Sequence, residues 1–164
     1  MRNYYKEGNI TQESIELCRK TWIQYLRKPH IKKHKGFLES RHTRSKRCCL
    51  GHACFVLGLK SDTDFDGDVA YWNDNPGSYH PIQRYNNSSF TKLPPRASAQ
   101  LNIDVNGTFH KPIKLNVHPY DMEYTCLSSV NDNTNLTLPQ IADIIEEQLK
   151  AGNIKESKYV KFSK

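Results

Sequence analysis

A short apolar run holds most of the side chains that could act as nucleophiles or soft metal ligands. The run CCLGHACFVLGL contains three of the five cysteines of the chain: Cys48, Cys49 and Cys54. A thiolate at a helix N-terminus has a lowered pKa, and the basic Arg47 next to it would lower that pKa further. Together with His118 and either Asn131 or Asp132, Cys49 would make a Cys-His-Asn type of catalytic set, since such partners need only be close in space.

The same run has two other interpretations. Cysteine is among the residues most often fully buried, so an apolar context favours a structural role over catalysis. Zinc could use the thiols together with His52, but adjacent residues seldom converge on one ion, and the C-x-x-C pairs of structural zinc sites are absent. The odd number of cysteines, five, with one adjacent pair, favours reduced thiols over a disulfide scaffold.

A second candidate site is an acidic, turn-rich loop predicted from Ser61 to Ser78. Its carboxylates at Asp62, Asp64 and Asp66 precede Gly67, as at the start of a calcium-binding loop. The position where such loops place a bidentate glutamate is Asn73 here. We therefore expect either a weak Ca²⁺ site or a solvated acidic loop that pairs with basic residues.

The positive charge is concentrated in one segment, residues 27–47. This segment contains nine lysines and arginines against one glutamate, together with three histidines, whereas the rest of the chain has 15 basic and 16 acidic residues. The net charge of +7 therefore comes from 21 residues. Such a segment attracts phosphate-bearing ligands, nucleic acid or acidic surfaces, or it is a solvated loop.

Aromatic side chains that alternate with basic ones are typical of nucleotide-binding surfaces, because cations neutralise phosphate while rings stack on bases. The candidate charge contacts are Arg41, Arg44, Lys46 and Arg47. The candidate stacking residues are Tyr71, Trp72 and Tyr85, and the candidate base-edge readers are Asn131 and Asp132 at a predicted strand-to-helix turn. Aromatic residues on short strands are more often part of the core, which is the alternative interpretation.

These residues need few elements to position them. Capping and periodicity predict an N-terminal helix from Thr11 to Lys28, a buried helix from about Cys49, a short helix from Pro95 towards Leu101, and a C-terminal amphipathic helix after Thr137. Expected strands lie at 36–40, 79–85, 113–117 and 123–130, the last two paired with each other, and a hairpin turn is expected at Asn106-Gly107. The tail 153–164 is expected either to be frayed and flexible or to dock through Tyr159 and Phe162.

Four motifs follow one another in an order that resembles a known group. They are KRCCLGHAC at 46–54, LP at 93–94, LSSVND at 127–132 and IADIIEE at 141–147. The chain is similar in these stretches to a widespread group of small phage and prophage proteins, but it has His52 and Val130 where that group usually has an aliphatic residue and leucine. The resemblance implies an accessory phage protein made in the infected bacterial cell. It implies no catalytic residues, because the group has no established activity.

The 164 residues suit a single α+β domain, 1–164, with an N-terminal helix, central short antiparallel strands and a C-terminal amphipathic helix. No apolar stretch reaches membrane-spanning length and no signal peptide is evident, so we expect a cytoplasmic protein without membrane contact. We also expect a homo-oligomer, because small domains often build ligand pockets across symmetric interfaces.

Three hypotheses for function follow from these patterns. The first is a non-catalytic binder of a phosphate-bearing ligand, such as a nucleotide signal of host anti-phage defence that the protein would sequester. The second is a cysteine- or metal-dependent enzyme that acts on a nucleotide or another small substrate. The third is an inhibitor that binds nucleic acid or a host protein. The first is favoured, because no phosphate loop, hydrolase elbow or zinc-protease motif occurs.

Overall fold

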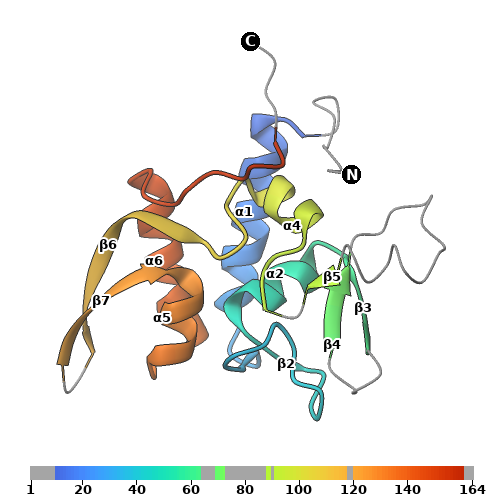
Figure 1. Ribbon diagram of the computed structural model, residues 1–164, viewed down its shortest axis with the longest axis horizontal. Helices are drawn as coiled ribbons and strands as arrows, with labels where there is room; N and C mark the ends of the chain where they lie inside the picture. The colour runs from blue at the N-terminus through green and yellow to red at the C-terminus, as the bar shows by residue number, and fades with distance from the viewer. Residues whose placement is uncertain (1–9, 64–68, 73–87, 90, 118–119, 161–164) are drawn as a thin grey trace.

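The computed structural model describes residues 10–63, 69–72, 88–89, 91–117 and 120–160. Its fold is mixed α+β, as predicted, with a helix at each end of the described chain (Figure 1). The helices are α1 (Gln12–Leu26), α2 (Cys49–Val56), α4 (Pro95–Leu101), α5 (Leu127–Asn133) and α6 (Leu138–Lys150). The strands are β1 (Lys32–Lys33), β2 (Lys46–Arg47), β3 (Lys60–Thr63), β4 (Val69–Trp72), β5 (Ser88–Ser89), β6 (Thr108–Val117) and β7 (Tyr120–Cys126).

The two terminal helices begin where the sequence predicts. The hydroxyl of Thr11 accepts a hydrogen bond from the Ser14 amide at the start of α1, and Thr137 and Gln140 form a capping box at the start of α6. Gly152 has φ +65° just beyond α6, in the left-handed region that favours glycine at a helix end. Local capping chemistry therefore sets these boundaries, which explains why they could be predicted.

The strands form three small sheets. β1 pairs with β2 in parallel, β3, β4 and β5 form an antiparallel sheet, and β6 and β7 form an antiparallel pair. In Figure 1 the β6–β7 pair lies at one side of the molecule and the β3–β4–β5 sheet lies at the other, with helices between them. The short strands are thus peripheral, and the helices build most of the interior.

Most of the buried apolar side chains form one core around α1. Trp22 of α1 is fully buried, and its indole N–H donates to the carbonyl of Cys49 at 2.9 Å. On the other side, Arg27 forms ion pairs with Asp143 at 2.8 Å and Glu146 at 3.2 Å on α6. α1 therefore joins α2 to α6, and this arrangement fixes the start of α2.

Several local predictions from the sequence are wrong. Residues 36–40 form bends with one isolated bridge, between Glu39 and Arg47, and not a strand, because their backbone bonds go to α2 and β2. The predicted loop from Ser61 includes parts of β3 and β4, which pair from Lys60 to Trp72. β3 is polar and the apolar β4 is only four residues long, so neither strand gave a clear alternating pattern.

Two further differences concern the second half of the chain. The Asn106-Gly107 turn does not join two strands: it precedes β6, and the Gly107 carbonyl accepts from Leu127 at the start of α5. The segment predicted as a strand from Glu123 to Val130 leaves the sheet at Cys126 and continues as α5. The pairing of residues 113–117 with residues around 123 is confirmed.

The segment after α6 docks on the body of the protein as far as Val160. Ile154 is buried and forms a bridge with Phe109, and the Ser157 amide donates to the side chain of Asn102 at 3.2 Å. Tyr159 packs on a small second cluster that contains Ile10 and Ile15. Phe162 and the predicted strand 79–85 lie outside the described residues. None of the helices in the described ranges has the length and the apolar character needed to cross a bilayer.

A candidate anion-binding cavity

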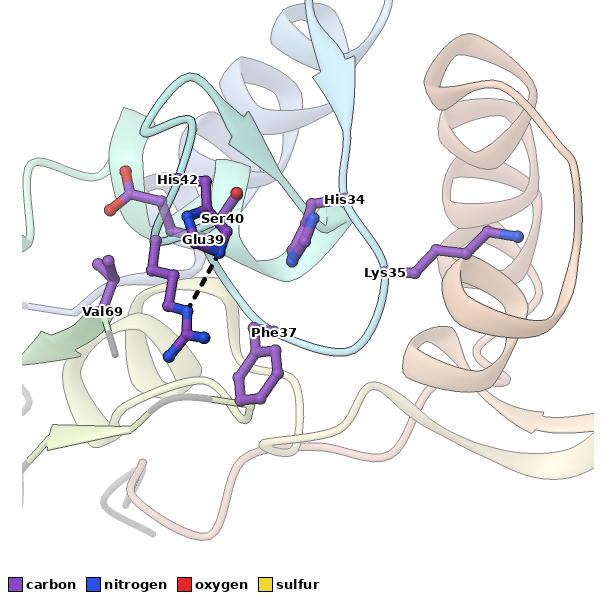
Figure 2. Close-up of a pocket in the computed structure, with 8 residues that line it drawn as sticks. His34, Lys35, Phe37, Glu39, Ser40, His42 and Val69 are labelled. Carbon is purple, nitrogen blue, oxygen red and sulfur yellow. Dashed lines mark hydrogen bonds between the residues drawn. The ribbon is translucent and has the colours of Figure 1, made fainter. Parts of the chain in front are cut away.

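A cavity of about 450 Å³ lies in the middle of the basic segment. One loop, residues 34–42, supplies all but one of the residues that line it; we call this loop the anchored loop and the space the loop cavity. The lining residues are His34, Lys35, Phe37, Glu39, Ser40, Arg41 and His42 from the anchored loop, and Val69 from β4 (Figure 2). The lining thus combines basic, imidazole, hydroxyl and aromatic groups.

Backbone hydrogen bonds hold the anchored loop against its neighbours along its length. The His34 amide donates to Arg47 at 2.9 Å, the Ser40 amide donates to Lys46 at 2.9 Å, and the Leu38 carbonyl accepts from Cys48 at 3.1 Å. The loop is therefore tied to β2 and to the start of α2 at three separate points. A loop held in this way is organised before any ligand arrives.

Gly51 allows α2 to pack directly on the anchored loop. A Cβ atom at this position would collide with the backbone carbonyl of Leu38, so only glycine fits. Leu38 itself is fully buried under this contact. The glycine of the CCLG motif thus has a structural task, which is to let the anchored loop lie against the helix.

Asn131 and Asp132, the predicted base-edge readers, support the anchored loop from behind. Asn131 is fully buried; its Oδ1 accepts from the Cys49 amide at 3.0 Å, and its Nδ2 donates to the His34 carbonyl at 2.8 Å. Asp132 accepts the Gly36 amide at 2.9 Å. Both residues lie in α5 and not at a strand-to-helix turn. The prediction that Asn131 contacts a ligand is wrong, because both polar atoms of its side chain already bond inside the protein. Asp132 is half-buried and lies outside the cavity lining, and its contact with a ligand stays a prediction.

A buried ion network stands behind the wall of the cavity. Glu39, with a side chain only 1 % exposed, pairs with Arg47 at 3.0 Å and with Arg44 at 2.9 Å. The Tyr71 hydroxyl donates to Glu39 at 3.2 Å and accepts from Arg47 Nε at 2.8 Å. The two guanidinium groups compensate the single carboxylate, so the network carries one excess positive charge.

This network accounts for three of the predicted ligand contacts. Arg47 is buried, with its guanidinium over the Phe55 ring at 4.0 Å, and Arg44 also bonds the Ser61 hydroxyl at 2.8 Å. Tyr71 is 1 % exposed, and burial raises the pKa of its hydroxyl. A ring and a cation that are enclosed in this way cannot stack on a base or meet a phosphate, so the predictions for Tyr71 and Arg47 are wrong. Arg44 is about half exposed and lies outside the cavity lining.

Among the predicted charge contacts, Arg41 is the one that lines the cavity. Its Nε donates to Nε2 of His42 at 3.3 Å, shown as the dashed line in Figure 2. Figure 2 also shows Lys35 extending away from the other lining residues, and its ammonium lies 3.4 Å from Asn135 Oδ1. Lys46 is exposed in β2 outside the cavity lining.

The cysteines do not form a reactive or metal-binding site in the described structure. Cys48 caps α2, its sulfur accepting from the Gly51 amide, and burial raises its pKa to about 12. Burial likewise raises the pKa of Cys49 and of Cys54 well above the ordinary thiol value. The expectation of a lowered pKa at Cys49 is therefore wrong: loss of hydration outweighs the helix terminus and the nearby charge.

The remaining predicted ligands fall partly outside the described residues. His118, Tyr85, Asp64 and Asp66 lie in segments that the structure does not describe, and for Asp62 and Trp72 only the backbone is described, in β3 and β4. Within the described ranges, no three His, Cys, Asp or Glu side chains come together to hold a metal ion. His52, considered for zinc, is fully buried; its Nε2 lies 2.9 Å from the Lys32 carbonyl, and burial lowers its pKa to about 4.

The lining residues that sequence reasoning did not assign are His34, Lys35, Phe37, Glu39, Ser40, His42 and Val69. Two signals pointed towards them. The histidines lie inside the basic segment, and Phe37 is the one Phe, Tyr or Trp residue of that segment. What the sequence did not provide is the fold of the loop, which turns these side chains towards one space.

Comparison of the chain with protein-family models, with curated proteins and with solved structures finds no match in any of the three. The function must therefore be argued from the geometry of the loop cavity itself.

Proposed function

We propose that this chain is a non-catalytic binding protein that holds a phosphate-bearing small ligand in the loop cavity. The observation that supports this proposal is that Arg41, His34 and His42 line one cavity of about 450 Å³ together with the Phe37 ring. A guanidinium group has the planar fork that pairs with phosphate oxygens, and imidazole can donate to the same group. Small-ligand sites typically measure about 300–1,000 Å³, so the cavity is of a suitable size.

The cationic character of the cavity survives the presence of Glu39 among its lining residues. Arg44 and Arg47 both pair with that carboxylate, so it adds no unbalanced negative charge. Burial lowers the pKa of His34, with Lys46 acting in the same direction and Asp132 opposing it, so His34 is largely neutral at pH 7 and donates as a neutral imidazole. Arg41 adds a guanidinium to the lining, and this group stays protonated at pH 7.

The biological role that we propose is sequestration of a nucleotide signal of host anti-phage defence in the cytoplasm of the infected cell. This part rests on the resemblance of the CCLG, LP, LSSVND and IADIIEE motifs to small phage proteins. A protein that binds and does not convert its ligand needs no nucleophile, which agrees with the burial of Cys48, Cys49 and Cys54.

The alternative of a nucleic-acid binder has less support, because the basic segment does not present its charge as one surface. Arg27 pairs with α6, and Lys33 donates to the carbonyls of Thr134 and Leu136 at 3.0 and 2.7 Å. Arg44 and Arg47 pair with Glu39. Among the described residues, at least these four of the nine basic side chains are used within the fold, so the segment does not present one extended phosphate track.

The experiment is ligand capture followed by release. Purified protein is incubated with a panel of linear and cyclic nucleotides, separated from unbound ligand and heated, and the released compound is identified by mass spectrometry. The proposal predicts intact ligand in a fixed ratio to protein. A chemically altered product would favour the enzyme alternative, and absence of binding to every member of the panel would refute the proposal.

A matched pair of variants tests the location of the site. Arg41→Gln removes one charge from the loop cavity, and Lys32→Gln removes one charge from an exposed residue of the same basic segment outside the cavity. We expect Arg41→Gln to weaken binding at least about tenfold, because a charged hydrogen bond contributes about 1.5–3 kcal/mol. Lys32→Gln should change affinity by less than about threefold at 0.15 M salt, where the Debye length is about 8 Å. Equal effects of the two would place the ligand elsewhere.

A further inference from the structure

We propose that an exposed aromatic surface on α1 and α2 docks an acidic peptide segment of another protein. Its members are two rings and two ammonium groups, those of Tyr25, Phe55, Lys28 and Lys32, and we call it the aromatic patch. It shares no residue with the lining of the loop cavity, so this proposal does not depend on the ligand proposed for that cavity. It is supported by the exposure of the rings, by the charge beside them and by the scarcity of acidic residues in the elements around them.

Phe55 is exposed at the end of a helix that is otherwise enclosed. Every residue of α2 from Cys49 to Cys54 is buried, whereas Phe55 is 46 % exposed. Its ring centre lies 5.8 Å from that of Tyr25, a half-buried residue of α1, and the two ring planes are tilted by 37°. Two rings from two helices thus form one apolar surface that reaches solvent. Such a surface suits the apolar anchor side chain of a protein partner.

Buried groups hold both rings from below. The guanidinium of Arg47 lies 4.0 Å from the centre of the Phe55 ring. The Tyr25 ring lies 5.6 Å from the ring of the fully buried His52, whose Nε2 is in turn 2.9 Å from the Lys32 carbonyl. Rings that are already fixed by packing lose little rotamer freedom when a partner binds, so less of the binding free energy is spent on ordering them.

Two exposed lysines add positive charge to the aromatic patch. Nζ of Lys28 lies 5.4 Å from the centre of the Tyr25 ring. Lys33 turns inwards and donates to two backbone carbonyls, so its exposed neighbour Lys32 on β1 turns to the opposite side, towards solvent. Cations at the rim of an apolar surface attract carboxylates and orient a partner that has them.

The elements that form the aromatic patch contain almost no acidic residues. Residues 17–61 include 12 lysines and arginines and a single carboxylate, that of Glu39. Glu39 is buried and pairs with two arginines of the same segment. Asp143 and Glu146 of α6 reach the end of α1 but pair with Arg27 there. The charge of the patch is therefore complementary to that of an acidic partner.

An acidic peptide fits this surface better than nucleic acid or a second copy of the chain. Each ring has a cation over one face and the rings are tilted, so they suit a branched or aromatic side chain more than the flat face of a base. The basic segment also presents no extended phosphate track, as described above. In a two-fold contact between copies, Lys28 and Lys32 would face the same lysines of the other copy, and like charges oppose such a contact.

The test begins with affinity selection of the full chain from a bead-displayed library of random synthetic peptides, at a salt concentration of about 0.15 M. Selected peptides are then labelled and titrated by fluorescence anisotropy. We expect them to combine aspartate or glutamate with leucine, phenylalanine or tryptophan. Phe55→Ala should weaken a selected peptide at least about tenfold, because it removes the anchor surface.

A charge reversal tests the lysines without disturbing the core, since Phe55→Ala also removes the ring that covers Arg47. Lys28 and Lys32 are exposed, so the double variant Lys28→Glu with Lys32→Glu is expected to fold normally. It should weaken the acidic peptide at least about tenfold. The same peptide with lysine in place of its acidic residues should show the reverse preference and bind the double variant more tightly than the wild type.

Matched controls lie on other parts of the surface. Met122→Ala truncates an apolar side chain of β7 that is 50 % exposed, and Lys155→Gln removes an exposed charge after α6. Both should change the affinity for a selected peptide by less than about twofold.

Four outcomes would overturn the proposal. They are the selection of no peptide, the selection of peptides without acidic residues, affinities that Phe55→Ala and the charge reversal leave unchanged, and the absence of a reversed preference for the lysine peptide. Tighter binding of a labelled oligothymidylate that is lost in the same variants would assign the surface to nucleic acid instead. A dimer in light scattering that the same variants dissociate would assign it to a second copy. None of these outcomes bears on the loop cavity, which Arg41→Gln tests separately.

Discussion

The anchored loop and helix α2 lie against each other but present opposite kinds of chemistry. α2 contains the most reactive residue types of the chain, and Cys49, His52 and Cys54 in it are completely buried. The anchored loop contains no thiol, and its His42, Arg41 and Phe37 are exposed around a cavity. Exposure to a cavity, and not residue type, therefore distinguishes the candidate site from a cluster of buried structural residues.

The two regions also divide their hydrogen bonds differently. In α2 the polar groups bond to the protein itself: the Cys49 amide to Asn131, the Cys48 sulfur to Gly51 and the His52 ring to the Lys32 carbonyl. In the anchored loop the backbone is bonded, and the side chains of His34, Phe37, Ser40, Arg41 and His42 line the cavity. Substitutions in α2 should therefore lower the free energy of unfolding. Substitutions of the loop side chains that line the cavity should instead lower the affinity for ligand.

The largest expected difference between the two regions is in thiol reactivity. Native protein treated with iodoacetamide should label the half-buried Cys18 and Cys126 first, because they are not enclosed like the other three. Cys48, Cys49 and Cys54 should react on the order of 10³-fold more slowly than in the unfolded chain, since they must wait for an opening that costs several kcal/mol. Mass spectrometry of tryptic peptides measures this, and fast labelling of Cys49 would contradict its structural role.

The next largest effect is expected at the ion network between the two regions. Glu39→Gln removes the carboxylate that compensates Arg47, and a buried unpaired charge costs about 3–5 kcal/mol. Urea unfolding should show a loss of stability in this range. Glu147→Gln, at an exposed position of α6, is the control and should stay within about 0.5 kcal/mol. A small loss for Glu39→Gln would mean that the network is not closed in solution.

Gly51→Ala tests the direct contact between α2 and the anchored loop. The added methyl group meets the Leu38 carbonyl, which cannot move without breaking its bond to Cys48. We expect a loss of about 2–3 kcal/mol from overpacking, measured by urea unfolding, together with weaker ligand binding. Unchanged stability would show that the loop is free to withdraw from the helix.

Acid should destabilise the support by way of His52. Burial lowers its folded-state pKa to about 4, compared with about 6.5 in an unfolded chain, so protons bind preferentially to the unfolded state. The stability from this residue is present above about pH 6.5 and is lost as the pH falls towards 4. Between pH 7.5 and pH 5 the loss should be about 2 kcal/mol.

The matched variant for this prediction is His52→Gln, which keeps a donor for the Lys32 carbonyl but does not titrate. Its stability should fall less steeply than that of the wild type over the same range of pH. Parallel curves would exclude His52 as the source. The lowered pKa of His34 acts in the same direction in both proteins and cancels in the difference.

The sequence predicted elements whose boundaries depend on local chemistry. The caps at Thr11 and Thr137, the start of α2 at Cys49 and the start of α4 at Pro95 are all local signals, and all are confirmed. β3 and β4 were missed because β3 is polar and the apolar β4 is only four residues long, so their pairing leaves no clear alternation in the sequence. The strand expected to continue to Val130 ends earlier because α5 packs against α2, a tertiary contact that periodicity does not contain.

The site was predicted less well, and for a different reason. The basic segment contains every lining residue of the cavity except Val69, but which of its side chains turn inwards or outwards depends on partners elsewhere in the chain. Arg47 is buried because Glu39, Tyr71 and Phe55 surround it. The side-chain amide of Asn131 is bonded to the backbone of Cys49 and His34. Sequence spacing does not encode these choices, since each depends on residues that are distant in the sequence.

The packing of α1 against α6 also has a consequence for how the chain folds. The ion pair between Arg27 and Asp143 joins residues 116 positions apart, and α1 is central to the core. A contact of this sequence separation cannot form until α6 has been synthesised, and closing so long a loop slows folding. We therefore expect the core to assemble only after α6 has been synthesised, because α1 packs against it. We also expect refolding to be slower than in helical proteins with mainly local contacts.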